Sequence, residues 1–338
     1  MCSAFLDLYA GIHAVEEVLL AVVTRRFFLG FSVAATRRLL GTETVPEPLP
    51  AARSYRVDAT ILLLSLPIYT RTNVGYGYAS YLATRGADRS THLLEFAARS
   101  LPERARGLNR LGMIRETVAE NGGGIVEAHY FGFMTASREV SLSEAKKALD
   151  NSSAQTLFVA IEGESRPEEV RSRRARFVAD ACVGAAEWKH LQSLAEAGLR
   201  DPAEKGGEQR PRPKSADAAP PTFLFALLRA VRSREEKLRQ VYVYGRDRFE
   251  LATAKKPDPR TGQRLAAKGV AHRAASVTAI AGTIRNLRTG EKIVFRVWTE
   301  DGGDPVPLRI EYQPRSYLQL ALETEPEGRA SVRARMRR

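Results

Sequence analysis

Polar and apolar side chains alternate along several segments of the chain, and this period of two is typical of β-strands that bury one face. In the first such segment Val57, Ala59 and Ile61 lie on one side, with polar residues between most of them. The same period recurs at 74–78, 113–118, 126–131, 156–162 and 174–183, and again at 241–251, 268–284, 292–299, 308–312 and 317–323. Asn121-Gly122 separates two of these segments, and this dipeptide favours a tight antiparallel hairpin. The pattern therefore predicts a β-rich protein.

Helical spacing occurs in three shorter segments, namely 141–149, 185–199 and 223–232. In the last of them Thr222 can cap the first turn, and Phe223, Leu227 and Val231 share one face. We expect this helix to plug or cover the sheet. The segment 258–262 is expected to be a turn because it combines Asp, Pro and Gly. The predicted fold class is mainly β with a few helices: a strongly curved antiparallel sheet, half-barrel or barrel with covering helices.

Composition divides the chain further. Residues 201–221 combine Pro, Gly and charged side chains with almost nothing to bury, which predicts a flexible linker. This linker separates a β-rich first half, 53–200, from a second half, 222–328, made of a helix and further strands. Residues 1–52 have the features of a leader, and the arginine-rich residues 329–338 are expected to form a disordered basic tail.

The bulk composition sets limits on the class of protein. Of 338 residues, 44% are hydrophobic and 27% charged, which fits a globular protein and excludes a collagen-like, fully disordered or polytopic membrane protein. Two cysteines, Cys2 and Cys182, are too few for a cysteine-rich zinc site, an iron–sulfur cluster or a disulfide scaffold. The net charge of +13 suits an anionic membrane surface or nucleic acid, or serves solubility alone.

The amino-terminal segment carries the most specific local signal. Thr24-Arg25-Arg26-Phe27-Phe28-Leu29 resembles a twin-arginine export signal, with Gly30 in place of the commonest residue at the next position. The defining residues are Arg25, Arg26, Phe28 and Leu29. The apolar segment that follows is too short to cross a bilayer and is typical of the h-region of a signal peptide. An alternative reading is that the two arginines end an amphipathic helix.

We therefore expect export by the twin-arginine machinery and a periplasmic location. We expect the signal peptide to be cleaved near Ala52, because Pro50-Ala51-Ala52 is the cluster of small residues that the segment 42–52 offers. Residues 1–22 are longer than a typical n-region and contain no Lys or Arg. We hypothesise that translation begins at Val23.

The closing part of the chain resembles a bacterial family. Four segments carry the resemblance: Trp298-Thr299-Glu300-Asp301, Pro307-Leu308-Arg309-Ile310-Glu311, the final apolar strand ending at Leu322, and the glycine-rich hairpin at 73–78. They are similar to the exported domain-of-unknown-function family numbered 3108, or a close relative. The resemblance implies an envelope location and a β-rich fold from about Tyr55 to Glu325. It implies no catalytic residues, and the linker at 201–221 departs from the family pattern.

Catalytic and metal-binding motifs are sparse. The five histidines show no His-x-His or His-x-x-x-His spacing, so we expect no metal site and no cofactor. No nucleophile elbow and no phosphate-binding loop is present. His129 and Glu127 share a strand face and are the candidate acid/base pair. The alternative is a polar pair on a solvated face.

Three functional hypotheses follow. The leading one is a non-enzymatic protein whose concave face binds a lipid or another apolar envelope component. Its expected lining is formed by Ile61, Leu63, Tyr76, Tyr78, Phe131, Phe133, Phe295 and Val297. The alternatives are an envelope hydrolase that uses His129 with Glu127, and a structural or adaptor protein that binds through arginines. No nucleic-acid partner is expected, and the sequence leaves the oligomeric state open.

Overall fold

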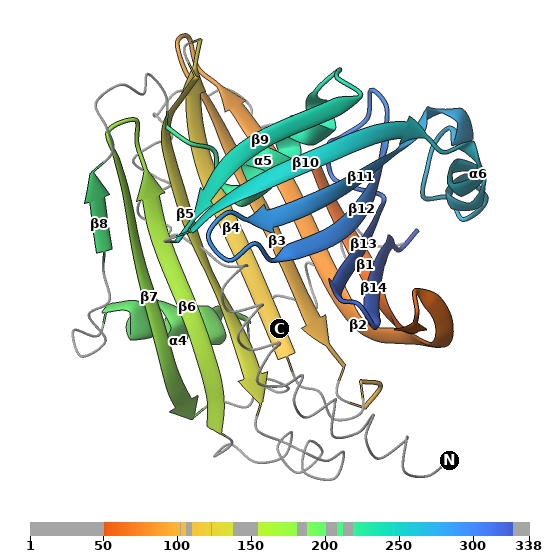
Figure 1. Cartoon of the computed structure of the whole chain (residues 1–338), viewed down its shortest axis with the longest axis horizontal. Coiled ribbons are helices and arrows are strands. Elements are labelled where there is room, and N and C mark those ends of the chain that lie inside the picture. The colour runs from red at the N-terminus through yellow and green to blue at the C-terminus, as the bar shows by residue number, and fades with distance from the viewer. Residues whose placement is uncertain are drawn as a thin grey trace.

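A computed structural model describes residues 51–101, 103–105, 110–122, 124–137, 155–180, 188–200, 208–211, 219–245 and 247–326. Fourteen strands form one antiparallel sheet in the order β8-β7-β6-β5-β4-β3-β2-β1-β14-β13-β12-β11-β10-β9 (Figure 1). The first half supplies β1 (Ala51–Leu63), β2 (Leu66–Arg85), β3 (Ser90–Ser100), β4 (Arg110–Asn121), β5 (Gly124–Ser137), β6 (Gln155–Ser165) and β7 (Glu169–Asp180). The remaining strands are β8 (Glu208–Pro211), β9 (Lys237–Tyr244), β10 (Asp247–Pro257), β11 (Val277–Asn286), β12 (Lys292–Glu300), β13 (Arg309–Arg315) and β14 (Leu318–Thr324).

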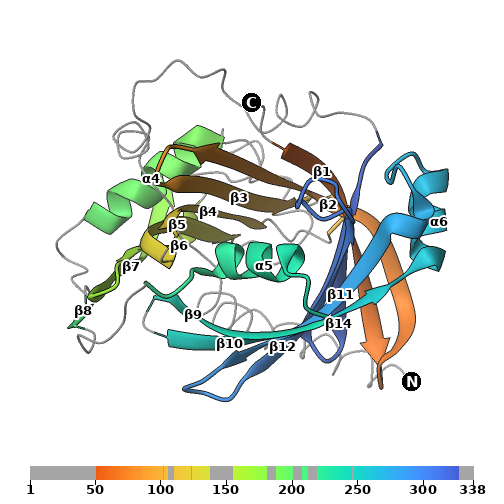
Figure 2. The same cartoon turned by 90° about the horizontal axis from the view of Figure 1, so that it is seen from above.

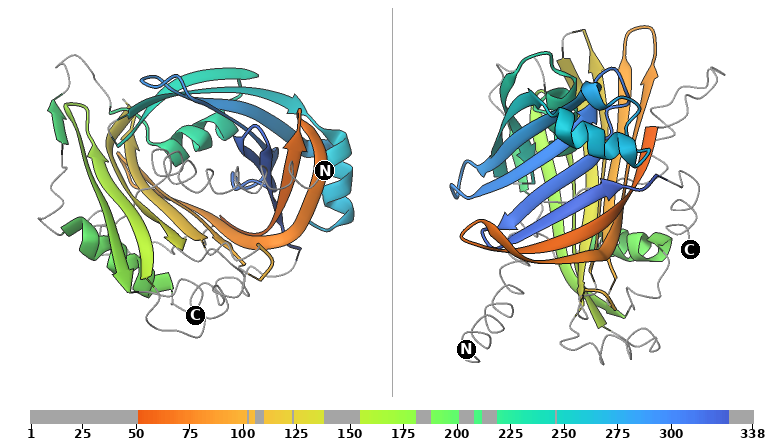
Figure 3. Two further views of the ribbon diagram at one scale, coloured as in Figure 1. Left: turned by 60° about the horizontal axis from the view of Figure 1, so that its bottom comes forward. Right: turned by 90° about the vertical axis from the view of Figure 1, so that its right-hand side faces the viewer.

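The two halves of the chain share this sheet because the first strand pairs with the last. β1 is antiparallel to β14, with Tyr55 opposite Thr324 and Ile61 opposite Leu318. The sheet coils until β9 returns toward β5, where the rings of Tyr130 and Tyr244 stack with centroids 6.4 Å apart. Within the described residues β8 and β9 remain the two ends of the strand order, so the coil is barrel-like but open (Figure 3, left). The predicted fold class is confirmed.

Each face of the coil carries a helix. α5 (Phe223–Arg232) lies inside it, between β3–β4 and β9, whereas α4 (Trp188–Arg200) covers the outer face of β5–β7 (Figure 2). Side chains of β5 alternate accordingly: Tyr130 belongs to the core around α5, and Phe131 to the core beneath α4. Helix α5 has the bounds and the plugging position predicted from the sequence.

Local structure departs from expectation at three places in the second half. Residues 259–267, expected to start with a turn, form helix α6 (Pro259–Ala267), because Asp258 accepts a hydrogen bond from the Thr261 amide and Pro259 occupies the first turn. A 3₁₀ turn, η2 (Ala274–Ser276), follows, so the strand expected over 268–284 begins only at Val277, after Gly269 adopts a positive φ of 68° and turns the chain. The single expected strand at 241–251 is instead a hairpin, since Gly245 adopts a positive φ of 57° and reverses the chain.

The short strand β8 lies within the segment 201–221 that the composition predicts to be a linker. Its four residues pair with β7, which offers an open edge there. Several other predictions fall outside the described residues. They are the export signal with Arg25, Arg26, Phe28 and Leu29, the helix at 141–149 and the basic tail at 329–338. None of the described helices combines the length and apolar composition needed to span a bilayer.

Candidate functional site

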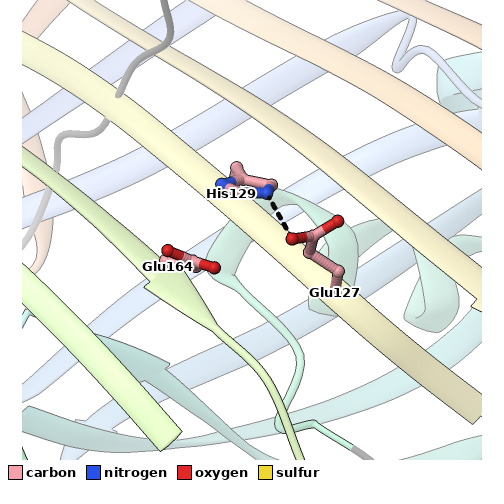
Figure 4. Close-up of side chains that lie close together, drawn as sticks. All are labelled: Glu127, His129 and Glu164. Carbon is pink, nitrogen blue, oxygen red and sulfur yellow. Dashed lines mark ion pairs between the residues drawn. The ribbon is translucent and has the colours of Figure 1, made fainter. Parts of the chain in front are cut away.

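The predicted acid/base pair does come together, on the outer face of the sheet (Figure 4). Nε2 of His129 lies 2.9 Å from Oε1 of Glu127, and the two side chains share a face because they are two residues apart on β5. Glu164 of β6 lies directly opposite His129 and completes a group of three. One nitrogen or oxygen atom from each residue lies within 4.8 Å of the others.

Two arginines from neighbouring turns neutralise this cluster. Arg166 donates to Oε1 of Glu127 at 2.8 Å and forms an ion pair with Glu164. Arg89 donates to the second oxygen of Glu127 at 3.2 Å. Burial raises the pKa of the Glu127 carboxyl, but the interaction with His129 and the hydrogen bonds from the two guanidinium groups lower it more, so the pKa lies below its usual range.

This arrangement limits the chemistry that the cluster can perform. A general base needs a lone pair that is free to accept a substrate proton. Both carboxylate oxygens of Glu127 already accept a hydrogen bond from an arginine, and Oε1 also pairs with His129, so Glu127 is poorly suited to this role. A divalent cation would have to displace Arg166 from two carboxylates. The cluster fits best as an ionic tie between the turn before β3, the strands β5 and β6, and the β6–β7 turn.

The predicted apolar lining is not brought together on one face. Phe131 and Phe133 are buried beneath α4 on the outer face. Tyr78 lies opposite Ala97, a member of the same outer core, and Tyr76 shares its face. Phe295 and Val297, by contrast, belong to the inner core around α5.

The remaining two residues of that prediction lie near the end of β1. Ile61 is half-buried, and Leu63 is 60% exposed at the tip of the β1–β2 hairpin. A concave pocket shared by all eight residues therefore does not exist. The alternation shows which residues share a strand face, but both faces of this sheet are apolar over β5, so the alternation does not show which face lines the interior.

A cavity that the sequence reasoning missed lies on the outer face of β9–β13, with a volume of about 650 Å³. Two cross-strand rows on this face form most of its lining, and the rest comes from Gln319 and from the row between them, which includes the predicted residue Phe295. The first row is Arg239, Ala252, Thr283, Val294 and Gln313, and the second is Lys237, Ala254, Ala281, Arg296 and Glu311. We call this cavity the outer groove.

The shape of the outer groove follows from side-chain size. Ala252 and Ala254 of β10 and Ala281 of β11 are small, whereas the flanking strands β9 and β12 carry long side chains. Lys237 of β9 and Arg296 of β12 therefore lie on opposite sides of an apolar floor. Its rows join residues more than 70 positions apart, so no local sequence pattern predicts the outer groove.

The residues of the family-like motif form a structural network beside this groove. Arg309 is ion-paired with Glu311 at 2.8 Å and with Glu323, and its guanidinium carbon lies 5.6 Å from the centre of the Trp298 ring. Nε1 of Trp298 donates to Asp258 at 2.9 Å. These contacts join α6 to β12, β13 and β14.

Comparison with known proteins gives limited further information. No family model and no curated protein matches the chain, so the resemblance to the family numbered 3108 stays a prediction. Among solved structures the chain is similar to a beta-barrel-like protein of the domain of unknown function DUF1849 from Brucella abortus. The TM-score is 0.43 and the identity 8%, over 82% of this chain and 96% of that one.

Proposed function

We propose that this protein is a non-enzymatic β-rich binding protein, exported to the periplasm, which holds an amphiphile with an apolar chain and an anionic head group in the outer groove. The observation that carries the proposal is the groove itself: a trough of alanines between two walls that bear cations. Fold class alone assigns no ligand, so the argument rests on the chemistry of this surface.

The inner face is a weaker candidate because α5 fills it and is fastened at both ends. At the start of the helix, Glu116 accepts hydrogen bonds from Thr222 and from two backbone amides. Near its end, Lys255 donates to the carbonyl of Val231 at 2.8 Å. A ligand on the concave face would have to displace this helix from a closely packed core.

The outer groove offers both parts of an amphiphile a partner. Its floor presents methyl groups from three alanines, against which an alkyl chain can exclude water. Its walls present Lys237 and Arg296, together with Arg239, which lies 3.7 Å from Glu250, while Glu311 is engaged by Arg309. An anionic carboxylate or phosphate is therefore the complementary head group.

The hydrolase alternative receives less support from the geometry. His129 and Glu127 are adjacent, as that hypothesis requires, but two arginines bind the carboxylate that would serve as the base. Export is proposed on the twin-arginine-like segment and on the family resemblance, and an exported protein would meet ligands of the cell envelope.

Binding of a dansyl-labelled long-chain fatty acid, followed by fluorescence, tests the proposal. Ala281→Trp places a large ring on the groove floor at an exposed position, and we expect it to weaken binding by about tenfold or more, equivalent to about 1.4 kcal/mol. Val178→Trp, at a 42% exposed position on β7, is the matched control and should bind normally.

Replacing Lys237 and Arg296 by Gln tests the contribution of the ligand head group separately from that of its apolar chain. The double variant should lose affinity for the labelled acid but keep its weaker affinity for the corresponding alcohol. Equal binding of the acid by wild type and Ala281→Trp, or no binding by wild type, would refute the proposal.

A further inference from the structure

The tip of the β1–β2 hairpin is the most apolar exposed surface among the described residues. Its side chains are Leu63, Leu64, Leu66, Ile68 and Tyr69, with exposed fractions of 60%, 91%, 67%, 56% and 51%. Soluble proteins rarely expose several large apolar side chains next to one another unless the surface contacts a partner. We refer to these five residues as the apolar tip.

The apolar tip extends beyond the strands on both sides of it (Figure 1). Pairing of β1 with β14 ends at Ile61, and pairing of β2 with β3 begins only at Gly75. The amide of Leu62 still donates to the carbonyl of Tyr317, so only the residues beyond it, up to the turn and back to Pro67, form a two-stranded ribbon that projects from the sheet (Figure 3, right). Residues 69–71 of β2 pair with β1 alone. A ribbon of two strands has no hydrophobic face to pack on and depends on its surroundings for burial.

Basic and aromatic side chains lie directly behind the tip. Tyr69, Ile61, Leu318 and Arg315 form one cross-strand row from β2 through β1 and β14 to β13. Arg71 follows on the same face of β2, two residues from Tyr69. Both arginine side chains are half-buried and belong to none of the ion pairs among the described residues, and Nη2 of Arg315 is buried without a hydrogen-bond partner.

This order, from aliphatic through tyrosine to arginine, matches the depth profile of a membrane interface. Aliphatic side chains enter the acyl region, tyrosine rings favour the head-group level, and arginines extend to lipid phosphates. A narrow ribbon can enter a lipid layer directly, whereas binding to a protein would require a pocket of matching shape on that partner. The net charge of +13 favours an anionic surface.

We propose that the apolar tip inserts into the interfacial layer of a bilayer rich in anionic phospholipid, with Arg71 and Arg315 binding head-group phosphates. This surface is distinct from the outer groove and does not require a ligand there. Gln313 and Gln319, which line the groove, adjoin this ribbon at the β13–β14 turn. A docked tip would therefore orient one end of the groove toward the membrane.

Co-sedimentation of the full chain with vesicles tests this proposal. We compare vesicles of phosphatidylcholine alone with an equimolar mixture of phosphatidylcholine and phosphatidylglycerol. Binding is expected only to the anionic vesicles and should weaken as salt is added. Absence of binding to both kinds of vesicle would refute the proposal, as would binding of equal strength to the two.

A variant that keeps the hairpin but removes its apolar side chains separates insertion from folding. Leu64 and Ser65 have positive φ angles of 51° and 68°, so Leu64→Asn with Ser65→Gly supplies residues that favour this turn. Leu66→Thr completes the triple variant with a good strand former. We expect normal folding and a loss of vesicle affinity of about tenfold or more.

Two further variants distinguish the alternatives. Leu287→Asn, at a 45% exposed position in another turn, is the matched control and should bind vesicles like wild type. Arg71→Gln with Arg315→Gln should remove most of the salt dependence. If the triple variant binds vesicles normally but abolishes self-association or capture of a protein, the tip is a protein interface and membrane insertion is wrong.

Discussion

Glu116 of β4 caps helix α5 from a position 106 residues away in the chain. Its carboxylate accepts a hydrogen bond from Oγ1 of Thr222 at 2.6 Å and from the amides of Leu224 and Phe225, both at 2.9 Å. The side chain is fully buried. A side-chain acceptor at a helix amino terminus satisfies backbone amides that have no partner within the helix. This contact fixes the plug to the inner wall of the coil.

Glu116→Gln should destabilise the protein by about 1–3 kcal/mol, because an amide accepts on one atom only and leaves buried donors unsatisfied. Urea unfolding followed by circular dichroism measures the change. Glu95→Gln, which alters a partly exposed ion pair with Arg115, is the control and should cost less than about 1 kcal/mol. A cost for Glu116→Gln no larger than that of the control would show that the cap is dispensable.

The stability contributed by Glu116 should depend on pH. Burial raises its pKa to about 7, although its hydrogen bonds oppose the shift. The folded state therefore holds a proton that the unfolded state releases above about pH 4.5, so the contribution is complete in acid and declines between about pH 4.5 and 7.

The free energy of unfolding of wild type minus that of Glu116→Gln isolates this effect. We expect the difference to fall by roughly 2 kcal/mol from pH 5 to pH 8. A difference that is constant or rises over this range would mean that the hydrogen bonds outweigh desolvation.

Glu323 of β14 should stabilise the protein with the opposite pH dependence. Burial raises its pKa, but Lys268, Arg264 and Arg309 lower it to about 2. The unfolded state therefore binds a proton first as the pH falls, and the contribution present above about pH 4.5 is lost toward pH 2.

Glu323→Gln should cost about 2 kcal/mol at neutral pH, less than a fully buried pair because two of the cations reach solvent. Its unfolding in acid should also be less steep than that of wild type. Glu250→Gln, whose carboxylate lies 3.7 Å from an exposed arginine, is the control. If the free energies of unfolding of Glu323→Gln and Glu250→Gln changed equally as the pH falls, the lowered pKa assigned to Glu323 would be wrong.

Gly163→Ala should disturb the contact between β5 and β6. A Cβ atom there would lie 2.1 Å from Cε2 of Tyr130, whose ring is fully buried against the inner core. We expect a loss of about 1–3 kcal/mol from overpacking, measured by thermal unfolding. Gly122→Ala, where a Cβ atom would have no neighbour within 4 Å, should change stability much less.

Arg25→Lys with Arg26→Lys tests the export signal. Because the twin-arginine pair defines the signal, we expect the precursor to accumulate inside the cell, as measured by fractionation and immunoblotting. Arg37→Lys with Arg38→Lys is the control and should leave export unchanged. Unaltered periplasmic protein in the first variant would show that these residues form no such signal.

The sequence by itself determined the local elements. Period-two alternation predicts most of the strands, although not β3 or β8, and the spacing of Phe223, Leu227 and Val231 predicts α5. Leu227 and Val231 are only partly buried in the structure, because the core contacts α5 on several sides. The same local logic placed Glu127 and His129 on one strand face. The Asp258-Pro259 start of α6 is also a local signal, but Asp, Pro and Gly within 258–262 equally favour a turn.

Only the tertiary structure decided which elements meet and which face lines the interior. Phe131 and Phe295 are equally apolar, yet one packs beneath α4 and the other against α5, because helices cover both faces of the coiled sheet. The capping of α5 by Glu116 and the rows of the outer groove likewise join distant residues. Such contacts are set by strand order and register across the whole sheet, which alternation within one strand does not encode.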